Sequence, residues 1–190
     1  MKKILIFKTD RLGDLLNISP IIKNLKLNYP NSSITLICSK YNKSIAQYYH
    51  NDVKLIIFEK PLIFFLLKNI KFLFFNNYDF IFQLDGKNHS YLASILIRAK
   101  KKVCIRFVKS KKILGLLIFI NRPNFLVNYF FDEKEISNEN YNIVDNINYH
   151  YLSLYLNLLK KLKIKILSKN HYLPFGKAKK ISSFKDGYCL

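Results

Sequence analysis

Short, continuous apolar runs alternate along this chain with longer segments whose apolar residues recur every three or four positions. The short runs have the length of strands that are buried on both faces, and the longer segments follow the period of a helix. We expect strands at residues 4–7, 34–38, 53–58, 80–84 and 103–107, and helices at 14–29, 43–50, 61–75, 90–99 and 144–162. This alternation predicts an α/β fold with a mainly parallel sheet, helices on both faces and the first strand in the centre.

The chain is also strongly basic. Its 190 residues carry 32 lysines and arginines against 12 aspartates and glutamates, a formal net charge of +20, and only four of the cations are arginines. Lysine, asparagine, isoleucine, phenylalanine and tyrosine all have A/T-rich codons, so a biased genome is the favoured explanation of this balance, and a functional basic face is the alternative. A basic face would fit an anionic membrane surface. No specific nucleic-acid partner is expected, because such recognition favours arginine and no nucleic-acid-binding motif is present.

Nothing in the sequence has the spacing of a metal site. The three cysteines, Cys38, Cys104 and Cys189, are an odd number, which is typical of a protein in a reducing compartment. His50, His150 and His171 have no companions at ligand spacing, and we expect them to be structural or exposed. Asp10 and Asp14 share one loop without an evident third ligand, so neither a metal nor a cofactor is expected.

No segment is long and apolar enough to span a membrane. The first apolar run, 4–7, is too short for the core of a signal peptide, and Lys68 and Lys71 interrupt the most apolar stretch, 61–75. That stretch places phenylalanines beside two cations. It fits a core-packed helix with solvated lysines and, equally, a helix that lies on an anionic membrane.

The loop after the first expected strand contains a candidate site. In an open parallel sheet, ligands bind beyond the carboxyl ends of the strands. This loop holds Thr9, Asp10, Arg11, Gly13 and Asp14, but neither the glycine-rich dinucleotide fingerprint nor the Gly-Lys-Ser/Thr of a phosphate-binding loop. We expect Gly13 to supply an unusual backbone conformation. Asp14 should begin the next helix, either as its N-cap alone or as an ionised functional carboxylate.

A second polar loop follows the fourth expected strand and should lie at the same edge of the sheet. Its Asp85 fits a turn-capping residue and a contact to the substrate equally well. Lys87 and His89, like Arg11 in the first loop, fit charge-assisted hydrogen bonds to substrate phosphates. Each of these three is also explained as solvated surface.

The first loop and the segment after it resemble a known enzyme family. The run KTDRLGD at 8–14, then Ser19-Pro20 and Tyr29-Pro30, resembles the opening of the lipopolysaccharide heptosyltransferases, glycosyltransferase family 9. In that family R-x-G-D is followed by a proline within the helix and by a Tyr-Pro or Phe-Pro stop. Looser likeness, over about residues 2–167, continues at 85–90, at 106–107 and at 151–154, although Arg106-Phe107 lacks the glycine of the family's Arg-Ile-Gly-Phe.

The resemblance implies a Rossmann-like acceptor-binding domain over 1–167, the N-terminal half of a GT-B architecture, followed at 168–190 by a basic tail or a linker toward a missing donor domain. It implies that Asp14 is the general base of an inverting glycosyltransferase. The residues then expected to contact substrate are Thr9, Asp10, Arg11, Gly13, Asp85, Lys87 and His89.

The partners follow from the same resemblance. The acceptor would be a lipopolysaccharide core or a related glycolipid, and the donor an ADP-heptose-like nucleotide sugar, bound as a substrate by the C-terminal domain. The chain alone should then be inactive, and its expected location is cytoplasmic, peripheral on the inner face of the cytoplasmic membrane. The alternative is a noncatalytic α/β remnant that binds an anionic glycolipid or a protein partner.

Overall fold

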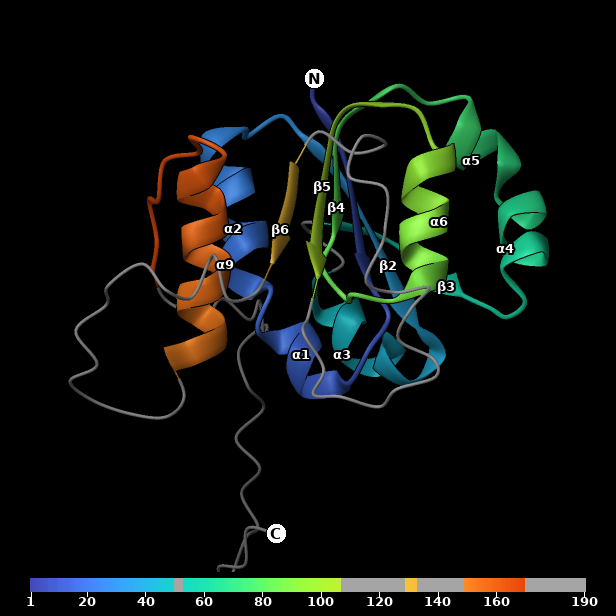
Figure 1. The fold of residues 1–190 in the computed structure, drawn as a ribbon, viewed down its shortest axis with the longest axis horizontal. Helices are drawn as coiled ribbons and strands as arrows, with labels where there is room; N and C mark the ends of the chain where they lie inside the picture. The colour runs from blue at the N-terminus through green and yellow to red at the C-terminus, as the bar shows by residue number, and fades with distance from the viewer. Residues whose placement is uncertain (50–52, 107–128, 133–148, 170–190) are drawn as a thin grey trace, which may run out of the picture.

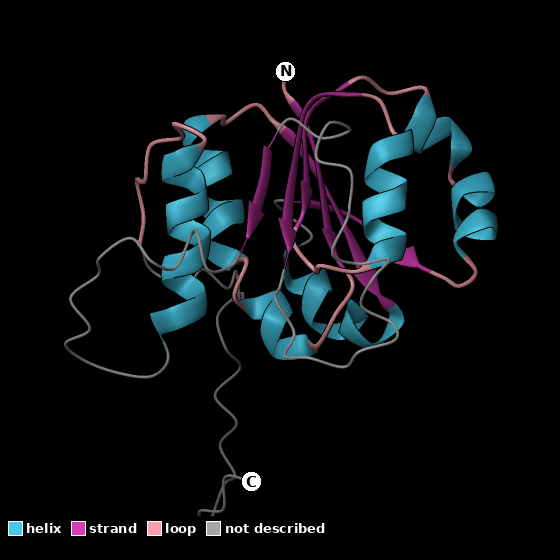
Figure 2. Cartoon of the chain, viewed as in Figure 1, coloured by secondary structure: helices cyan, strands magenta, loops and turns pink. Residues whose placement is uncertain are grey.

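Six parallel strands form one sheet in the computed structural model, which describes residues 1–49, 53–106, 129–132 and 149–169 (Figures 1 and 2). In the order β3-β2-β1-β4-β5-β6, every neighbouring pair is parallel. The strands are β1 Lys3–Lys8, β2 Ser33–Ser39, β3 Val53–Phe58, β4 Tyr78–Gln83, β5 Ala99–Arg106 and β6 Tyr129–Asp132. The predicted Rossmann-like α/β class is therefore confirmed. The order reverses between β1 and β4, the kind of switch point at which such sheets bind ligands.

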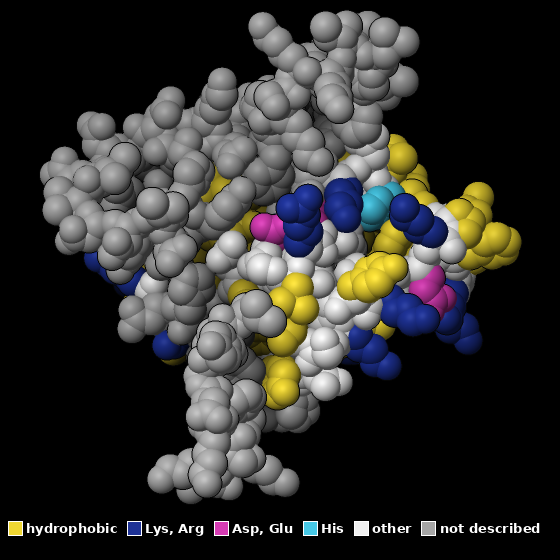
Figure 3. Space-filling model, turned by 90° about the horizontal axis from the view of Figure 1, so that it is seen from below, with side chains coloured by type: hydrophobic (Ala, Val, Ile, Leu, Met, Phe, Trp, Pro, Cys, Tyr) yellow, Lys and Arg dark blue, Asp and Glu magenta, His cyan; other side chains and the backbone are white. Residues whose placement is uncertain are grey.

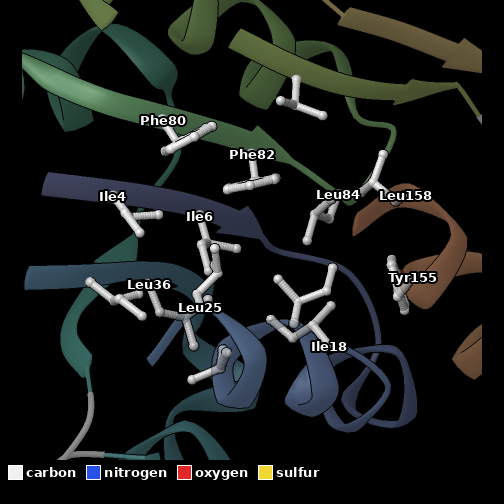
Figure 4. Packing of buried hydrophobic residues seen from close by; sticks show 14 of the residues in the cluster. Ile4, Ile6, Ile18, Leu25, Leu36, Phe80, Phe82, Leu84, Tyr155 and Leu158 are labelled. Carbon is white, nitrogen blue, oxygen red and sulfur yellow. The ribbon is translucent and has the colours of Figure 1, made fainter. Parts of the chain in front are cut away.

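The central strand β1 is buried on both faces. Ile4 and Ile6 point into one core, where they pack with residues such as Phe82 (Figure 4). Leu5 and Phe7 point into the opposite core, because successive side chains of a strand alternate between the two faces. Helices cover both cores, and this is why the strand is a continuous apolar run in the sequence.

The helices form two layers (Figure 1). Their bounds are α1 Leu12–Leu16, α2 Ser19–Asn28, α3 Lys43–Ala46 between the 3-10 turns Lys40–Asn42 and Gln47–Tyr49, α4 Leu62–Lys68, α5 Ile70–Phe74, α6 Asn88–Leu96 and α9 Tyr149–Lys161. The helices α2 and α9 contact each other and pack on the core of Ile4 and Ile6. The helices α4, α5 and α6 supply Phe65, Leu73 and Ala93 to the opposite core.

The helix expected over 14–29 is wrong as a single element, because it is two helices. Pro20 is the second residue of α2, and it lacks the N–H that would bond to the carbonyl of Leu16 in a continuous helix. The chain therefore leaves α1 after Leu16, and Ile18 is the N-cap of α2.

The helix expected over 61–75 is likewise two helices, divided at Asn69. The side-chain amide of Asn69 donates to the carbonyl oxygen of Phe65 at 2.9 Å, and its backbone carbonyl accepts from the N–H of Leu73 at 2.8 Å. Asn69 therefore ends α4 and begins α5, a role to which asparagine is suited because its side chain bonds to nearby backbone.

Other boundaries differ from the expected ones by a few residues. The helix expected over 43–50 is α only to Ala46, and α6 begins and ends earlier than 90–99. The strand β5 begins at Ala99 rather than at 103. Each shift is small and leaves the order of strands and helices unchanged.

Part of the expected organisation lies outside the described residues. This holds for 107–128, 133–148 and 170–190, and therefore for the start of the helix expected at 144 and for most of the tail. The domain boundary at 168 stays a prediction. Among the residues that the structure describes, no helix is long and apolar enough to cross a membrane.

Candidate functional site

The loop after β1 and the loop after β4 meet at the carboxyl edge of the sheet, next to the switch point. The carboxylate of Asp85 accepts hydrogen bonds from the backbone N–H of Thr9 at 3.1 Å and from its hydroxyl at 2.6 Å. The ammonium of Lys87 donates to the carbonyl oxygen of Thr9 at 2.9 Å. The sequence prediction that these loops share one edge is confirmed, and the two loops form one hydrogen-bonded unit.

Asp85 is the centre of this unit. Besides the two bonds from Thr9, its oxygens accept from the Ser90 hydroxyl at 2.6 Å, the Gln83 amide at 2.8 Å and the Lys87 N–H at 3.1 Å. The side chain is buried, so these donors replace the water that an ionised carboxylate needs. Of the two roles left open by the sequence, this geometry favours the turn-forming one.

The same bonds determine the tautomer of His89. The Thr9 hydroxyl has one proton and donates it to Asp85, so Nε2 of His89, 2.9 Å from Thr9 Oγ1, must be the donor to that oxygen. The His89 ring stacks on Phe58 with the ring centroids 4.3 Å apart. Burial lowers the pKa of His89, and Lys87 lowers it further although Asp85 opposes them. At neutral pH His89 is therefore uncharged, and its Nδ1 is a hydrogen-bond acceptor.

A buried ion pair supports the other side of the first loop. Lys8, the last residue of β1, donates to Asp10 Oδ2 at 2.8 Å, to the carbonyl oxygen of Leu84 at 2.9 Å and to the Tyr155 hydroxyl at 2.9 Å. Burial alone would lower the pKa of Lys8, but Tyr155 and Asp10 outweigh it and hold the pKa above its usual range. Burial raises the pKa of Asp10 against the opposing effect of Lys8, and it raises that of Tyr155 to about 12.

This network gives Asp10 an internal partner. One carboxylate oxygen of Asp10 bonds to Lys8, and the other is buried without a hydrogen-bond partner among the described residues. Through Lys8, the loop is also fixed to Tyr155 of α9. Asp10 therefore shapes the loop, and the structure does not present it to a substrate as it presents Asp14.

Asp14 is the third residue of α1, whose N-cap is Arg11. The interpretation of Asp14 as an N-cap is therefore wrong, because the N-cap lies three residues before it. Its side chain is partly exposed, and no described residue donates a hydrogen bond to it. Of the aspartates in the two loops, Asp14 has the carboxylate that is available to a ligand.

The two glycines of the loops differ from expectation. Gly13 lies within α1, and its φ is not in the left-handed region, so the unusual conformation expected there is absent. A Cβ added at Gly13 would meet no atom of the described residues within 4 Å. The left-handed conformation is instead at Gly86, with φ of 61°, in the Asp-Gly turn after β4, where it was not predicted.

Basic side chains surround the site. Figure 3 shows a histidine between lysine or arginine side chains on the face that contains the carboxyl ends of the strands. Arg11 is exposed at the start of α1, and Lys60 is close enough to His89 to lower its pKa. No cluster of three potential metal ligands occurs within the described ranges. Among the residues that the structure describes, the site therefore offers the carboxylate of Asp14, the neutral imidazole of His89 and several cations.

Comparison with solved structures finds this fold in glycosyltransferases. E. coli heptosyltransferase WaaC with ADP is 16% identical with a TM-score of 0.59, and the match covers 90% of this chain and 51% of that chain. A glycosyl transferase of family 9 from Veillonella parvula is 16% identical with a TM-score of 0.60, over 90% of this chain and 44% of that one. The chain thus spans about half the length of these proteins. No family model and no curated protein matches it.

The fold alone does not determine a chemistry. An FMN-dependent Ubix-like decarboxylase from E. coli matches with a TM-score of 0.53 at 11% identity, over 90% of this chain and 99% of that one. Since one sheet architecture serves both group transfer and decarboxylation, the function has to be argued from the site.

Proposed function

We propose that this chain is the acceptor-binding, N-terminal half of an inverting glycosyltransferase of the ADP-heptose:lipopolysaccharide heptosyltransferase type. The fold likeness to WaaC and to the family 9 enzyme supports the class. The observation that carries the proposal is the state of Asp14, a partly exposed carboxylate in the first turn of α1 to which no described residue donates a hydrogen bond. It follows Arg11 and Gly13, as in the opening that the chain resembles.

In this reaction Asp14 is the general base. An acceptor hydroxyl attacks the anomeric carbon of the nucleotide sugar, its proton passes to the Asp14 carboxylate, and the bond from that carbon to the diphosphate oxygen breaks. The new glycosidic bond forms on the face opposite the leaving diphosphate, which inverts the configuration. A base within hydrogen-bond reach of the hydroxyl accelerates such a step by about 10²–10⁴-fold.

The remaining side chains of the site suit an anionic acceptor. Arg11 and Lys87 can donate charge-assisted hydrogen bonds to phosphate or carboxylate groups, and Nδ1 of His89 can accept from a sugar hydroxyl. Thr9 and Asp85 hold the two loops together and position these groups rather than bind substrate themselves. The acceptor we propose is a lipopolysaccharide core or a related glycolipid, and the donor is an ADP-heptose-like nucleotide sugar bound by a second domain.

The experiment is glycosyl transfer by the chain fused to, or mixed with, a matching C-terminal donor domain. Asp14→Asn removes the base and should lower the rate by about 10²–10⁴-fold while the melting temperature stays nearly unchanged, because the carboxylate has no described hydrogen bond to lose. Glu59→Gln, an exposed carboxylate that pairs with Lys68, is the matched control and should retain full activity.

Two results would contradict this function. Unchanged transfer by the Asp14→Asn variant would exclude Asp14 as the base. Binding of an anionic glycolipid by the chain, with no transfer in any combination with a donor domain, would instead support the noncatalytic binding module.

A further inference from the structure

The helices α4 and α5 leave an unusual amount of apolar surface in solvent. Six large apolar side chains are exposed here, five on these two short helices and the sixth at Phe75, directly after α5; Phe64 is exposed to 66% and Phe75 to 81%. We call this set the α4–α5 patch: Ile63, Phe64, Leu67, Ile70, Phe74 and Phe75. Figure 3 shows hydrophobic side chains next to lysine or arginine side chains at this edge of the molecule. Exposed apolar groups gathered in this way mark a contact surface.

Packing of the core does not account for the patch. Each of the two helices is attached to the sheet through other residues, Phe65 of α4 and Leu73 of α5, which are buried beside Leu5 and Phe7. The patch residues point away from that core. The sequence left open whether this stretch is core-packed or lies on a membrane, and the structure shows that one face is packed while the other is exposed.

Lysines outnumber acidic side chains around the patch. Lys60, Lys68 and Lys71 are exposed, and the sequence has no aspartate or glutamate between 60 and 78. The nearest acid, Glu59, makes an exposed ion pair with Lys68 at 2.9 Å, and such pairs are weak in water. Apolar side chains flanked by lysines are the composition of segments that insert shallowly into anionic lipid surfaces.

We propose that the α4–α5 patch docks on an anionic lipid bilayer, with its phenylalanines and aliphatic side chains inserted among the headgroups and Lys60, Lys68 and Lys71 at the level of the phosphates. The net charge of +20 favours a negative surface and opposes a second copy of the same chain as the occupant. This docking is independent of the proposed sugar transfer, and it is tested without any enzymatic assay.

The test is sedimentation of the chain with vesicles of phosphatidylglycerol and phosphatidylcholine mixed equally, compared with vesicles of phosphatidylcholine alone. We expect binding to the anionic vesicles only. The double variant Phe64→Ser, Phe75→Ser should weaken it by about tenfold or more, since buried aromatic area is lost. The double variant Lys68→Gln, Lys71→Gln should weaken it by about fivefold for each lysine, and added salt should weaken it in the unmodified chain.

Matched controls lie on the opposite side of the sheet. Leu27→Ser with Leu167→Ser removes two exposed leucines, and Lys165→Gln with Lys169→Gln removes two exposed lysines, all away from α4 and α5. Both controls should bind as the unmodified chain does. Equal binding by patch variants and controls would overturn the proposal, as would absence of binding to anionic vesicles. Self-association in sedimentation velocity that the phenylalanine variant abolishes, without vesicle binding, would overturn it in favour of a protein interface.

Discussion

The hydroxyl of Thr9 donates to the carboxylate of Asp85 at 2.6 Å and thereby connects two loops that are 76 residues apart in the sequence. The strands that precede these loops, β1 and β4, are neighbours at the switch point of the sheet. The bond therefore holds the two loops of the candidate site together at the point where the strand order of the sheet reverses. It also determines, through the single hydroxyl proton, which nitrogen of His89 carries hydrogen.

Asp85→Asn should destabilise the protein by about 3 kcal/mol. The substitution replaces one carboxylate oxygen, which accepts hydrogen bonds, by an N–H₂ group, which cannot accept them. The donors that lose an acceptor are buried with it, among them the hydroxyls of Thr9 and Ser90. Urea unfolding at neutral pH measures the change. Glu59→Gln, which breaks only an exposed ion pair, should cost less than about 0.5 kcal/mol. Equal, small effects of the two substitutions would show that Asp85 does not hold the loops together.

The strands were predictable because a parallel strand that is buried on both faces is a short, uninterrupted apolar run in the sequence. The residues 4–7 are apolar without interruption since helices cover both faces of β1, and the position of the Thr9 and Asp85 loops at one edge follows from the parallel order. The helix boundaries were less predictable. Pro20 and Asn69 each divide an apolar periodicity that continues across the break, because the side chains on both sides still face the same core.

The support of the first loop could not be predicted. Lys8 bonds to Tyr155, which is 147 residues away, and nothing in the local pattern indicates that α9 packs against the end of β1. A lysine that directly ends a buried apolar strand was the available signal, since burial of its ammonium demands several acceptors. For Asp85 the sequence left a turn-capping role open, but it did not show that the donors to this carboxylate come from both loops.

The stability of the protein should fall as the pH is lowered below 6.5, in part through His89. Burial, Lys87 and Lys60 lower the pKa of this histidine in the folded state, while Asp85 opposes them. In the unfolded state His89 binds a proton near its ordinary pKa of 6.5. Below that pH the unfolded chain therefore binds more protons than the folded protein, and the free energy of unfolding decreases as the pH falls. His89→Gln retains an amide donor for Thr9 Oγ1 but does not titrate.

Urea unfolding at about pH 7.5 and at about pH 5.5 tests this dependence. The difference in unfolding free energy between the two pH values should be smaller for the His89→Gln variant than for the unmodified chain. Titrations of all other groups are common to both proteins and cancel in the comparison. If both proteins lose the same stability, His89 does not contribute, and its ring is then not held neutral by the fold.

Gly13→Ala separates the structural role of this glycine from its place in the proposed site. Gly13 is helical without a left-handed φ, and an added Cβ meets no atom of the described part of the chain within 4 Å. Alanine should therefore stabilise the fold by about 0.5 kcal/mol through its helix propensity. Gly86→Ala is the contrasting variant and should destabilise the fold, because the φ of 61° at this position strains any residue with a Cβ.

The open space beside Gly13 adjoins Asp14, where an acceptor would have to approach. In the assay with a donor domain, Gly13→Ala should therefore lower kcat/KM for the acceptor by about tenfold although the protein melts at a higher temperature. Full transfer activity in the stabilised variant would mean that no substrate lies against Gly13, and the acceptor would then have to reach Asp14 from another side.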